Sequence, residues 1–469
     1  MTAAPMTAIE PSTAMRGVAP TTRVLLVAIV ASTVVFLDGT VVNLALPATA
    51  RDIGGGMCTQ QWIVDAYLLA VAAMVLPGGA ISDLFGRIPV MRLGLVAFGA
   101  GCALAATAGS PSMLITGRVV QGLGGAFLVP GSLALINSSF EQGRARALGA
   151  WTAWTGTAFA VGPLLGGLAV DFLSWRWIYV LSAIPVTIGV ALTFWLRPVP
   201  APSERARIDV PGAALSAVGL TATVYALIEQ GRRGWDDPLV GGALVAGVAA
   251  LCAFVAWQRR APYPMVPPSL FTTRNFAGAN LVTAFVYGGI TMGSLAIALY
   301  LQEVGGYSAT ASGLITLPSP IMSLLFARGV GGVAARIGPR VFLMAGPALA
   351  GVGLLLIRPI AHGGHVVADV LPGRIVLAIG MVLAITPLTA VGLSAVKAAH
   401  SGIAAAIQNA TGRTSALIAV AVMGVITSNR LTDASFAQLL RVSAVLFFVG
   451  AALGGLAIRN RADRAGVEA

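Results

Sequence analysis

Apolar blocks of about 20 residues recur along the whole chain, and charged residues are confined to the segments between them. A helix of that length crosses the hydrocarbon core of a bilayer, whereas the apolar segments of soluble proteins end sooner. Only 10% of the residues are charged and the mean hydropathy is +0.87, while a soluble domain carries about 25% charged residues. The sequence therefore predicts an all-α polytopic membrane protein.

Fourteen candidate spans follow from this pattern. They cover residues 23–46, 61–81, 90–109, 114–136, 147–169, 177–196, 210–229, 239–257, 277–302, 311–330, 341–358, 374–393, 402–427 and 436–458. A weak internal repeat relates residues 79–87 to residues 331–340, and each copy is expected on a loop between the second and third helix of its half. Duplicated halves with a substrate site between them are typical of secondary transporters.

The repeat divides the chain into segments. We expect a disordered cytoplasmic tail (1–22), an N-terminal six-helix bundle (23–196), a linker with two inserted helices (197–276), a C-terminal six-helix bundle (277–458) and a second cytoplasmic tail (459–469). With the N-terminus inside, 19 of the 29 basic residues fall on the cytoplasmic side and three fall within spans. The scarcity of lysine and the abundance of alanine and glycine indicate GC-rich coding, so we expect a bacterial cytoplasmic membrane.

Asp38 lies inside the first apolar block, which runs from Val24 to Leu46. A carboxylate at that depth costs about 2.5–3.5 kcal/mol on insertion scales, so an acid within a span is a candidate functional residue. The alternative is an acid that a neighbouring helix satisfies and that has no further role. The chain around Asp38 helps to choose between the two.

Residues 37–47, which read Leu-Asp-Gly-Thr-Val-Val-Asn-Leu-Ala-Leu-Pro, resemble the first-helix signature of the fourteen-span drug:proton antiporters of the major facilitator superfamily. The resemblance extends from Thr22 to about Arg459. Residues 209–212 and 234–235, which flank the first inserted helix, fit the fourteen-span branch. The resemblance implies two six-helix bundles plus two inserted helices, and export by alternating access.

Arg118 opens the sequence Arg-Val-Val-Gln-Gly-Leu-Gly-Gly, which resembles the fourth-helix motif of the same family. A guanidinium inside a span needs a partner, and the family's geometry implies that Asp38 is that partner. A helix motion that changes their separation would change the proton affinity of the carboxylate, at about 1.4 kcal/mol per pKa unit. The alternative is a static arginine bonded to backbone carbonyls.

Two further motifs resemble those of the family. The loop motif implies a conformational latch, which in the family stabilises the outward-facing state. The candidate latch residues are Gly79, Asp83, Gly86 and Arg87. Leu84 and Ile88 replace basic residues that are usual in this motif. The antiporter motif of the fifth span separates exporters from most importers and consists of Gly162, Pro163, Gly166 and Gly167. Its small residues allow close helix packing, and its proline bends the helix.

Asp65 is a second acid within a span, and we group it with Asp38 and Arg118 as a proton-coupling candidate. It lies about a turn from the predicted interface, so simple solvation is the alternative. The polar residues that we expect around a substrate cavity are Asn43, Tyr67, Gln121, Asn280, Tyr287, Gln408 and Asn409. Hydrogen bonding between helices is the alternative role for each of them.

Neither an HExxH motif, nor a phosphate-binding loop, nor a nucleophile–base pair is found in the sequence. We therefore expect no enzyme, no metal and no cofactor, with the proton gradient as the energy source. The net charge of +12 carries no basic run of five residues, so nucleic acid is not an expected partner. The expected partners are a small-molecule substrate, protons and membrane lipid, and the expected functional form is a monomer.

The hypothesis is thus a proton-coupled exporter of drugs or amphipathic and cationic small molecules. Two alternatives remain open. One is a transporter dedicated to a single metabolite or antibiotic, or one that takes its substrate up, although the motif at Gly162 argues against uptake. The other is a membrane sensor that transports nothing.

Overall fold

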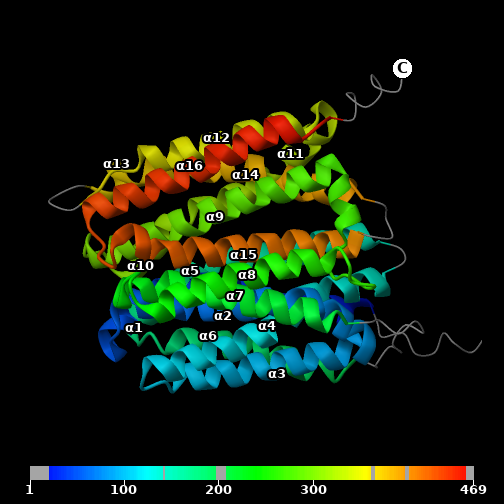
Figure 1. The fold of residues 1–469 in the computed structure, drawn as a ribbon, viewed down its shortest axis with the longest axis horizontal. Helices are drawn as coiled ribbons and strands as arrows, with labels where there is room; N and C mark the ends of the chain where they lie inside the picture. Colours follow the sequence, from blue (N-terminus) through cyan, green and yellow to red (C-terminus); the bar gives the residue numbers. More distant parts are fainter. Residues whose placement is uncertain (1–20, 141–142, 197–207, 361–364, 397–400, 461–469) are drawn as a thin grey trace, which may run out of the picture.

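The computed structural model describes residues 21–140, 143–196, 208–360, 365–396 and 401–460, and all of its regular structure there is helical. Within these residues, 13 helical spans are long and apolar enough to cross a membrane, and the apolar helix Trp177–Thr193 is shorter, with 17 residues. Figure 1 shows the helices running along the long axis of the molecule. These observations confirm the prediction of a fourteen-helix membrane protein.

The first eight spans are single helices close to the predicted positions. They are α1 (Thr21–Ile53), α2 (Gly56–Phe85), α3 (Arg87–Ala106), α4 (Pro111–Ser139), α5 (Arg144–Phe172), α6 (Trp177–Thr193), α7 (Val210–Arg233) and α8 (Pro238–Gln258). The predicted disordered tail, 1–22, was too long, because α1 already includes Thr21 and Thr22. Residues 1–20, most of the predicted linker at 197–207, and the tail from 461 lie outside the described residues.

The last six spans begin after a short 3₁₀ helix, η2 (Pro268–Thr272). Four are single helices: α9 (Arg274–Glu303), α12 (Pro339–Leu356), α15 (Ser401–Thr427) and α16 (Asp433–Ala457). The other two are each broken in two, as α10 (Ala309–Thr316) with α11 (Pro318–Ile337), and as α13 (Val366–Asp369) with α14 (Leu371–Ser394). A proline stands in the first turn of both α11 and α14, where its missing N–H group costs nothing.

Helices α1 to α6 pack on one another, with α4 against α1, α2 and α3. Helices α9 to α16 form a second group, in which α12 packs against α14 and α16 while α9 packs against α15 and α16. The inserted helices α7 and α8 pair with each other, and α7 also packs against α2 and α15. Glu229 on α7 accepts a hydrogen bond from Trp62 Nε1 of α2 at 3.1 Å. The insertion therefore lies across the seam between the two groups.

Asp209 joins the ends of α7 and α8. Its carboxylate accepts hydrogen bonds from Trp257 Nε1 at 2.8 Å, from Gln258 Nε2 at 2.6 Å and from the backbone N–H of Gly212 at 2.9 Å. Burial alone would raise the pKa of Asp209, but the hydrogen bonds from these three groups outweigh it and hold the pKa below its ordinary value.

The start of α1 (dark blue) and the end of α16 (red) lie at the same end of the molecule (Figure 1). We call it the inner end, and the opposite end, where α1 and α9 finish, the outer end. Hydrogen bonds between the two groups of helices lie near the outer end. Gln60 Nε2 donates to Glu303 Oε1 at 2.5 Å, and Gln61 Nε2 donates to Val420 O at 2.6 Å.

The expectation that the repeated motif lies on loops was wrong. The repeated residues 79–85 and 331–337 belong to α2 and α11, and only Gly86 and Gly338 lie between helices. These two glycines share a backbone conformation, with φ of 89° and 94°, that residues other than glycine rarely adopt. Arg374, the first residue of the predicted span 374–393, is only 2% exposed within α14. It is enclosed there because α14 begins three residues earlier, at Leu371.

Candidate functional site

An ion pair between α1 and α4 lies at the buried centre of the N-terminal group. Asp38 is 0% exposed, Arg118 is 2% exposed, and Arg118 Nη1 lies 2.7 Å from Asp38 Oδ2. Charges removed from water lose their solvation, so such a pair persists only where each partner is well hydrogen-bonded. The structure thus brings together the two residues that the family resemblance pairs.

Gln121, one turn beyond Arg118, completes the network. Its Oε1 accepts from Arg118 Nη1 at 2.9 Å, and its Nε2 donates to Asp38 Oδ1 at 3.3 Å. Arg118 Nε donates to the carbonyl oxygen of Ile63 at 2.9 Å, and the guanidinium carbon lies 4.4 Å from the centroid of the Tyr67 ring. The ion pair is therefore held by α2 as well as by α1 and α4.

Close backbone packing of α4 brings these side chains within reach of one another. A Cβ atom added to Gly122 would lie 2.5 Å from Tyr67 O of α2, and one added to Gly124 would lie 2.4 Å from Gly94 O of α3. Only glycine permits such approaches. The glycines of the fourth-helix motif thus set the helix spacing, while Arg118 and Gln121 supply the polar groups.

Asp65 is 0% exposed on α2, and neither of its carboxylate oxygens has a hydrogen-bond partner among the described residues. The alternative of simple solvation is therefore wrong. It failed because α2 is enclosed by other helices, with α4, α7 and α15 packed against it. An unpartnered buried carboxylate is expensive in its charged form, so Asp65 is a candidate for binding a proton or a cation.

Arg413 and two tyrosines belong to three helices from the two groups. Arg413 of α15 lies within electrostatic range of both Tyr67 of α2 and Tyr287 of α9. Tyr67 is 2% exposed, and its hydroxyl has no hydrogen-bond partner among the described residues. Arg413 is half-buried and forms no ion pair with any described carboxylate.

The remaining cavity candidates have mixed surroundings. Asn280 Oδ1 accepts from Thr411 at 3.1 Å, and Gln408 Nε2 donates to Thr283 at 3.3 Å. These bonds join α9 to α15, as the alternative of hydrogen bonding between helices expects. Asn43 on α1 and Asn409 on α15 are half-buried.

The latch residues make their described contacts inside the N-terminal group. Asp83 and Arg87 form an ion pair at 3.4 Å, and Arg87 Nη1 donates to Ala134 O of α4 at 3.0 Å. Gly79 lies within α2, and Gly86 makes the turn into α3. The structure places these residues together at the inner end, on the side where α1 begins.

The antiporter motif on α5 faces both groups of helices. A Cβ atom added to Gly162 or Gly166 would overlap with α1, at 2.1 Å from Thr40 Oγ1 and 2.9 Å from Val41 Cβ respectively. On the other side, a Cβ added to Gly167 would lie 2.5 Å from Cα of Thr310 on α10. Pro163 lies on the same side, because its carbonyl oxygen would be 2.5 Å from a Cβ at Gly313. The motif therefore forms part of the seam.

Sequence reasoning missed a contact one turn beyond this motif. The Asp171 carboxylate of α5 accepts hydrogen bonds from the backbone N–H groups of Ala309 and Thr310, at 3.0 and 2.8 Å. It thus caps the first turn of α10 in the other group of helices. Asp171 stands four residues after Gly167, and that spacing is the only sequence signal that could have suggested the contact.

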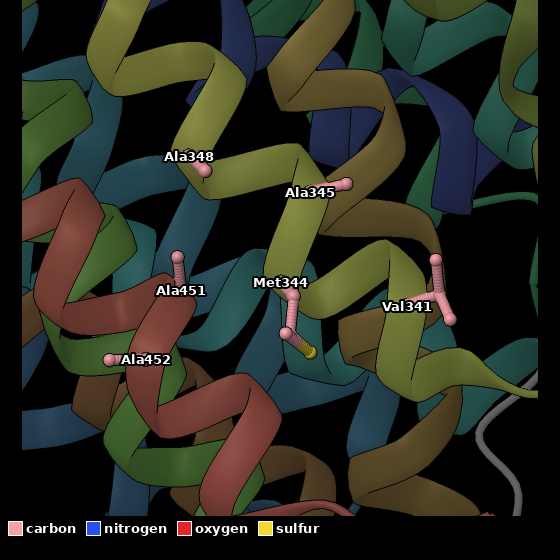
Figure 2. A pocket seen from close by; sticks show the side chains of 6 residues that line it. All are labelled: Val341, Met344, Ala345, Ala348, Ala451 and Ala452. Carbon is pink, nitrogen blue, oxygen red and sulfur yellow. The ribbon is translucent and has the colours of Figure 1, made fainter.

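Among the described residues, no group of three or more His, Cys, Asp or Glu side chains could hold a metal. Two hollows are found elsewhere on the surface. One lies on α7, beside Tyr225, and the other lies between α12 and α16 (Figure 2). Neither includes a residue of the ion-pair network.

Comparison with known proteins identifies the family. Residues 28–421 match the family model described as the Major Facilitator Superfamily. The chain is 36% identical to the puromycin resistance protein pur8 of Streptomyces alboniger over 86% of this chain and 81% of that protein. It is 33% identical to the multidrug resistance protein Stp of Mycobacterium tuberculosis over 83% of this chain and 73% of that one.

The fold is also found among solved structures. A crystal structure of an auto-inhibited peptide transporter of the POT family aligns with 94% of this chain and 98% of its own, with a TM-score of 0.68 and 18% identity. At that identity the match shows a shared fold only. The family match, the relatives and the fourteen-helix fold together show that the chain belongs to the Major Facilitator Superfamily, as a transporter of its multidrug-resistance type.

Proposed function

We propose that the chain is a proton-coupled exporter of amphipathic or cationic small molecules, working by alternating access as a monomer in a bacterial cytoplasmic membrane. The observation that carries the proposal is the buried network of Asp38, Arg118 and Gln121. A carboxylate buried in a span is costly to keep, and its usual role in transporters is to relay protons. With the proton gradient as the energy source, no cofactor is needed.

In the proposed cycle, Asp38 releases a proton as substrate binds and takes one up as substrate leaves. A neutral Asp38 would interact more weakly with Arg118, so α1 and α4 could separate. One charge that moves across 100 mV supplies about 2.3 kcal/mol. Protonation of Asp38 is thus coupled to helix packing, because the packing of α4 sets the distance between the Asp38 carboxylate and the Arg118 guanidinium.

The seam supports the alternating part of the cycle. The hydrogen bonds of Gln60, Gln61 and Asp171 join the two halves near the outer end, and they would have to break for that end to open. The latch pair Asp83–Arg87 bonds within its own half in this structure, which leaves it available to bind the other half in the alternate state. Both termini are then cytoplasmic, as the arginine distribution predicts.

Replacement of Asp38 by Asn tests the proposal. Asn keeps the size of the side chain but cannot exchange a proton, so we expect proton-driven transport into inverted vesicles to fall at least tenfold. Asp52→Asn is the matched control, because Asp52 is a half-exposed acid on the same helix. Proton-driven efflux that survives in Asp38→Asn at normal expression would overturn the proposal.

A second candidate is export of one dedicated antibiotic. The relatives point both ways, since one is named for puromycin and another for multidrug resistance. A substrate panel in inverted vesicles separates the two, because a dedicated exporter would move one chemical scaffold only. A non-transporting sensor would release no proton from the purified protein when substrate is added.

A further inference from the structure

A shallow apolar groove of about 440 Å³ runs between α12 and α16. It is lined by Val341, Met344, Ala345, Ala348, Ala451 and Ala452. Figure 2 shows the alanines of the two helices beside the larger Val341 and Met344. The helices approach closely below it, because Met344 packs against Gly455 and Leu343 against Gly454. The volume falls in the range of small-molecule sites, and the lining is entirely apolar.

Arginines gather where this groove reaches the inner end. Arg340 directly precedes Val341 of the lining, and its Nε donates to Gly455 O at 2.8 Å. Arg274, at the start of α9, donates from Nη2 to Leu456 O at 2.5 Å and from Nε to Ala457 O at 3.2 Å. Both guanidinium groups are therefore placed at the last turn of α16, beside the glycine against which Met344 packs.

A third arginine, Arg459, follows the end of α16, and its backbone N–H donates to Asn275 Oδ1 at 3.0 Å, so its side chain starts beside Arg274. All three arginines are exposed, and none forms an ion pair with a described carboxylate. Arg340 uses only Nε in its described bond, so its two Nη groups remain as donors. Such a cluster suits a phosphate, which accepts several charge-assisted hydrogen bonds at once.

We propose that this groove binds one anionic phospholipid, with its phosphate at Arg274, Arg340 and Arg459 and an acyl chain along the alanines. Basic clusters between helices at the inner side of a membrane bind anionic headgroups. An anionic lipid fits better than a zwitterionic one. A zwitterionic headgroup carries an ammonium group, and no described carboxylate pairs with the three arginines or would bind that ammonium. A free phosphate would leave the apolar groove without an occupant.

The test uses the full-length protein in detergent, with phosphatidylglycerol and phosphatidylcholine of identical acyl chains as probes and native mass spectrometry as the readout. The double variant Arg340→Gln/Arg459→Gln should reduce retained phosphatidylglycerol at least fivefold. Phosphatidylcholine should be retained less than phosphatidylglycerol by the parent and should not change in the variant. Equal retention of phosphatidylglycerol by the parent and the variant would overturn the proposal.

Arg259→Gln/Arg260→Gln is the matched control, because it removes two exposed cations from the end of α8 at the same end of the molecule. Its lipid retention should equal that of the parent, and an equal loss would show that net charge alone matters.

Ala452→Phe fills the groove without touching the cluster. It should lower phosphatidylglycerol retention severalfold, whereas a site for free phosphate would be unaffected. Arg340→Lys keeps the charge and should retain most binding, which separates headgroup recognition from misfolding.

Discussion

At the scale of single residues, the charges near the centre differ in how they are balanced. Asp38 has Arg118 and Gln121 as partners, whereas Asp65 and Arg413 have no oppositely charged partner among the described residues. Breaking a buried pair by removing one partner costs about 3–5 kcal/mol, because the other charge is left unpaired. The Asp38–Arg118 pair is therefore suited to proton coupling, whereas Asp65 and Arg413 are suited to recognising the charge of a substrate.

Arg413→Gln should shift the charge preference of the transporter. Arg413 is half-buried and lies within electrostatic range of Tyr67 and Tyr287, and a unit charge acts on another 8 Å away with about 2 kcal/mol at an effective dielectric constant of 20. Its removal should tighten the binding of cationic dyes by up to about 30-fold and weaken that of anionic ones. Competition binding to the purified protein measures both. Arg441→Gln, an exposed cation on α16, should change neither, and an equal effect there would exclude a local role for Arg413.

The sequence identified Asp38 and Arg118 because family motifs surround both residues. It could not show the burial of Asp65, since a residue one turn from the end of a span is normally exposed to water. The helices that pack against α2 (α4, α7 and α15) come from other parts of the chain. Arg413 was visible as a charge within a span, but its neighbours Tyr67 and Tyr287 come from two other helices. Residue identity was thus predictable where a motif carried it, and proximity between helices was not.

At the scale of elements, Asp209 should make the α7–α8 hairpin sensitive to acid. Its pKa is lowered in the folded state, so its contribution to stability is complete above the unfolded pKa of about 3.9 and is lost as the pH falls through the folded value. Asp209→Asn should lower the apparent unfolding temperature at pH 7 by the equivalent of about 1–2 kcal/mol. The difference from the parent should shrink below about pH 4.

Thermal unfolding in detergent between pH 7 and pH 3 measures this difference. Asp236→Asn is the control, because Asp236 is an exposed acid on the same hairpin. It should leave the unfolding temperature unchanged at both pH values. A difference between Asp209→Asn and the parent that stays constant down to pH 3 would contradict the assignment of the effect to the ionised carboxylate.

Asp171→Ala should loosen the outer end of the seam. The carboxylate caps α10 across the seam, and loss of a helix cap costs about 0.5–2 kcal/mol. The equilibrium should shift towards outer opening by up to about 30-fold. The labelling rate of a cysteine at Glu303 by a membrane-impermeant maleimide, with Cys58, Cys102 and Cys252 replaced, reports that opening.

Asp52→Ala is the matched control, because Asp52 also lies at the outer end but bonds to Trp175 and Arg176 of its own half. Its labelling rate should stay near that of the parent. The sequence did not reveal the role of Asp171, since its partners are backbone N–H groups. Every residue carries a backbone N–H group, except proline, so such a contact leaves no pattern of side chains to read.

At the scale of the whole molecule, alternating access requires the seam at the outer end to open in every cycle. Gln60 and Glu303 are in contact across it. Cysteines at both positions, joined through two disulfides by a short bis-methanethiosulfonate reagent in a background without native cysteines, should stop efflux by more than 90% while substrate binding from the inner side persists. Cleavage of the linker by a reductant should restore efflux, because the halves can separate again.

A link of the same length within one half separates motion from chemical damage. Cysteines at Asp52 and Arg176 join α1 to the start of α6 inside the N-terminal group, and their cross-link should leave most efflux intact because a six-helix half moves as a unit in the proposed cycle. If linkage across Gln60 and Glu303 left efflux unchanged, the outer seam would not be the moving part. Transport would then have to proceed by motion within a half, and the ion pair of α1 and α4 would be the first place to look for it.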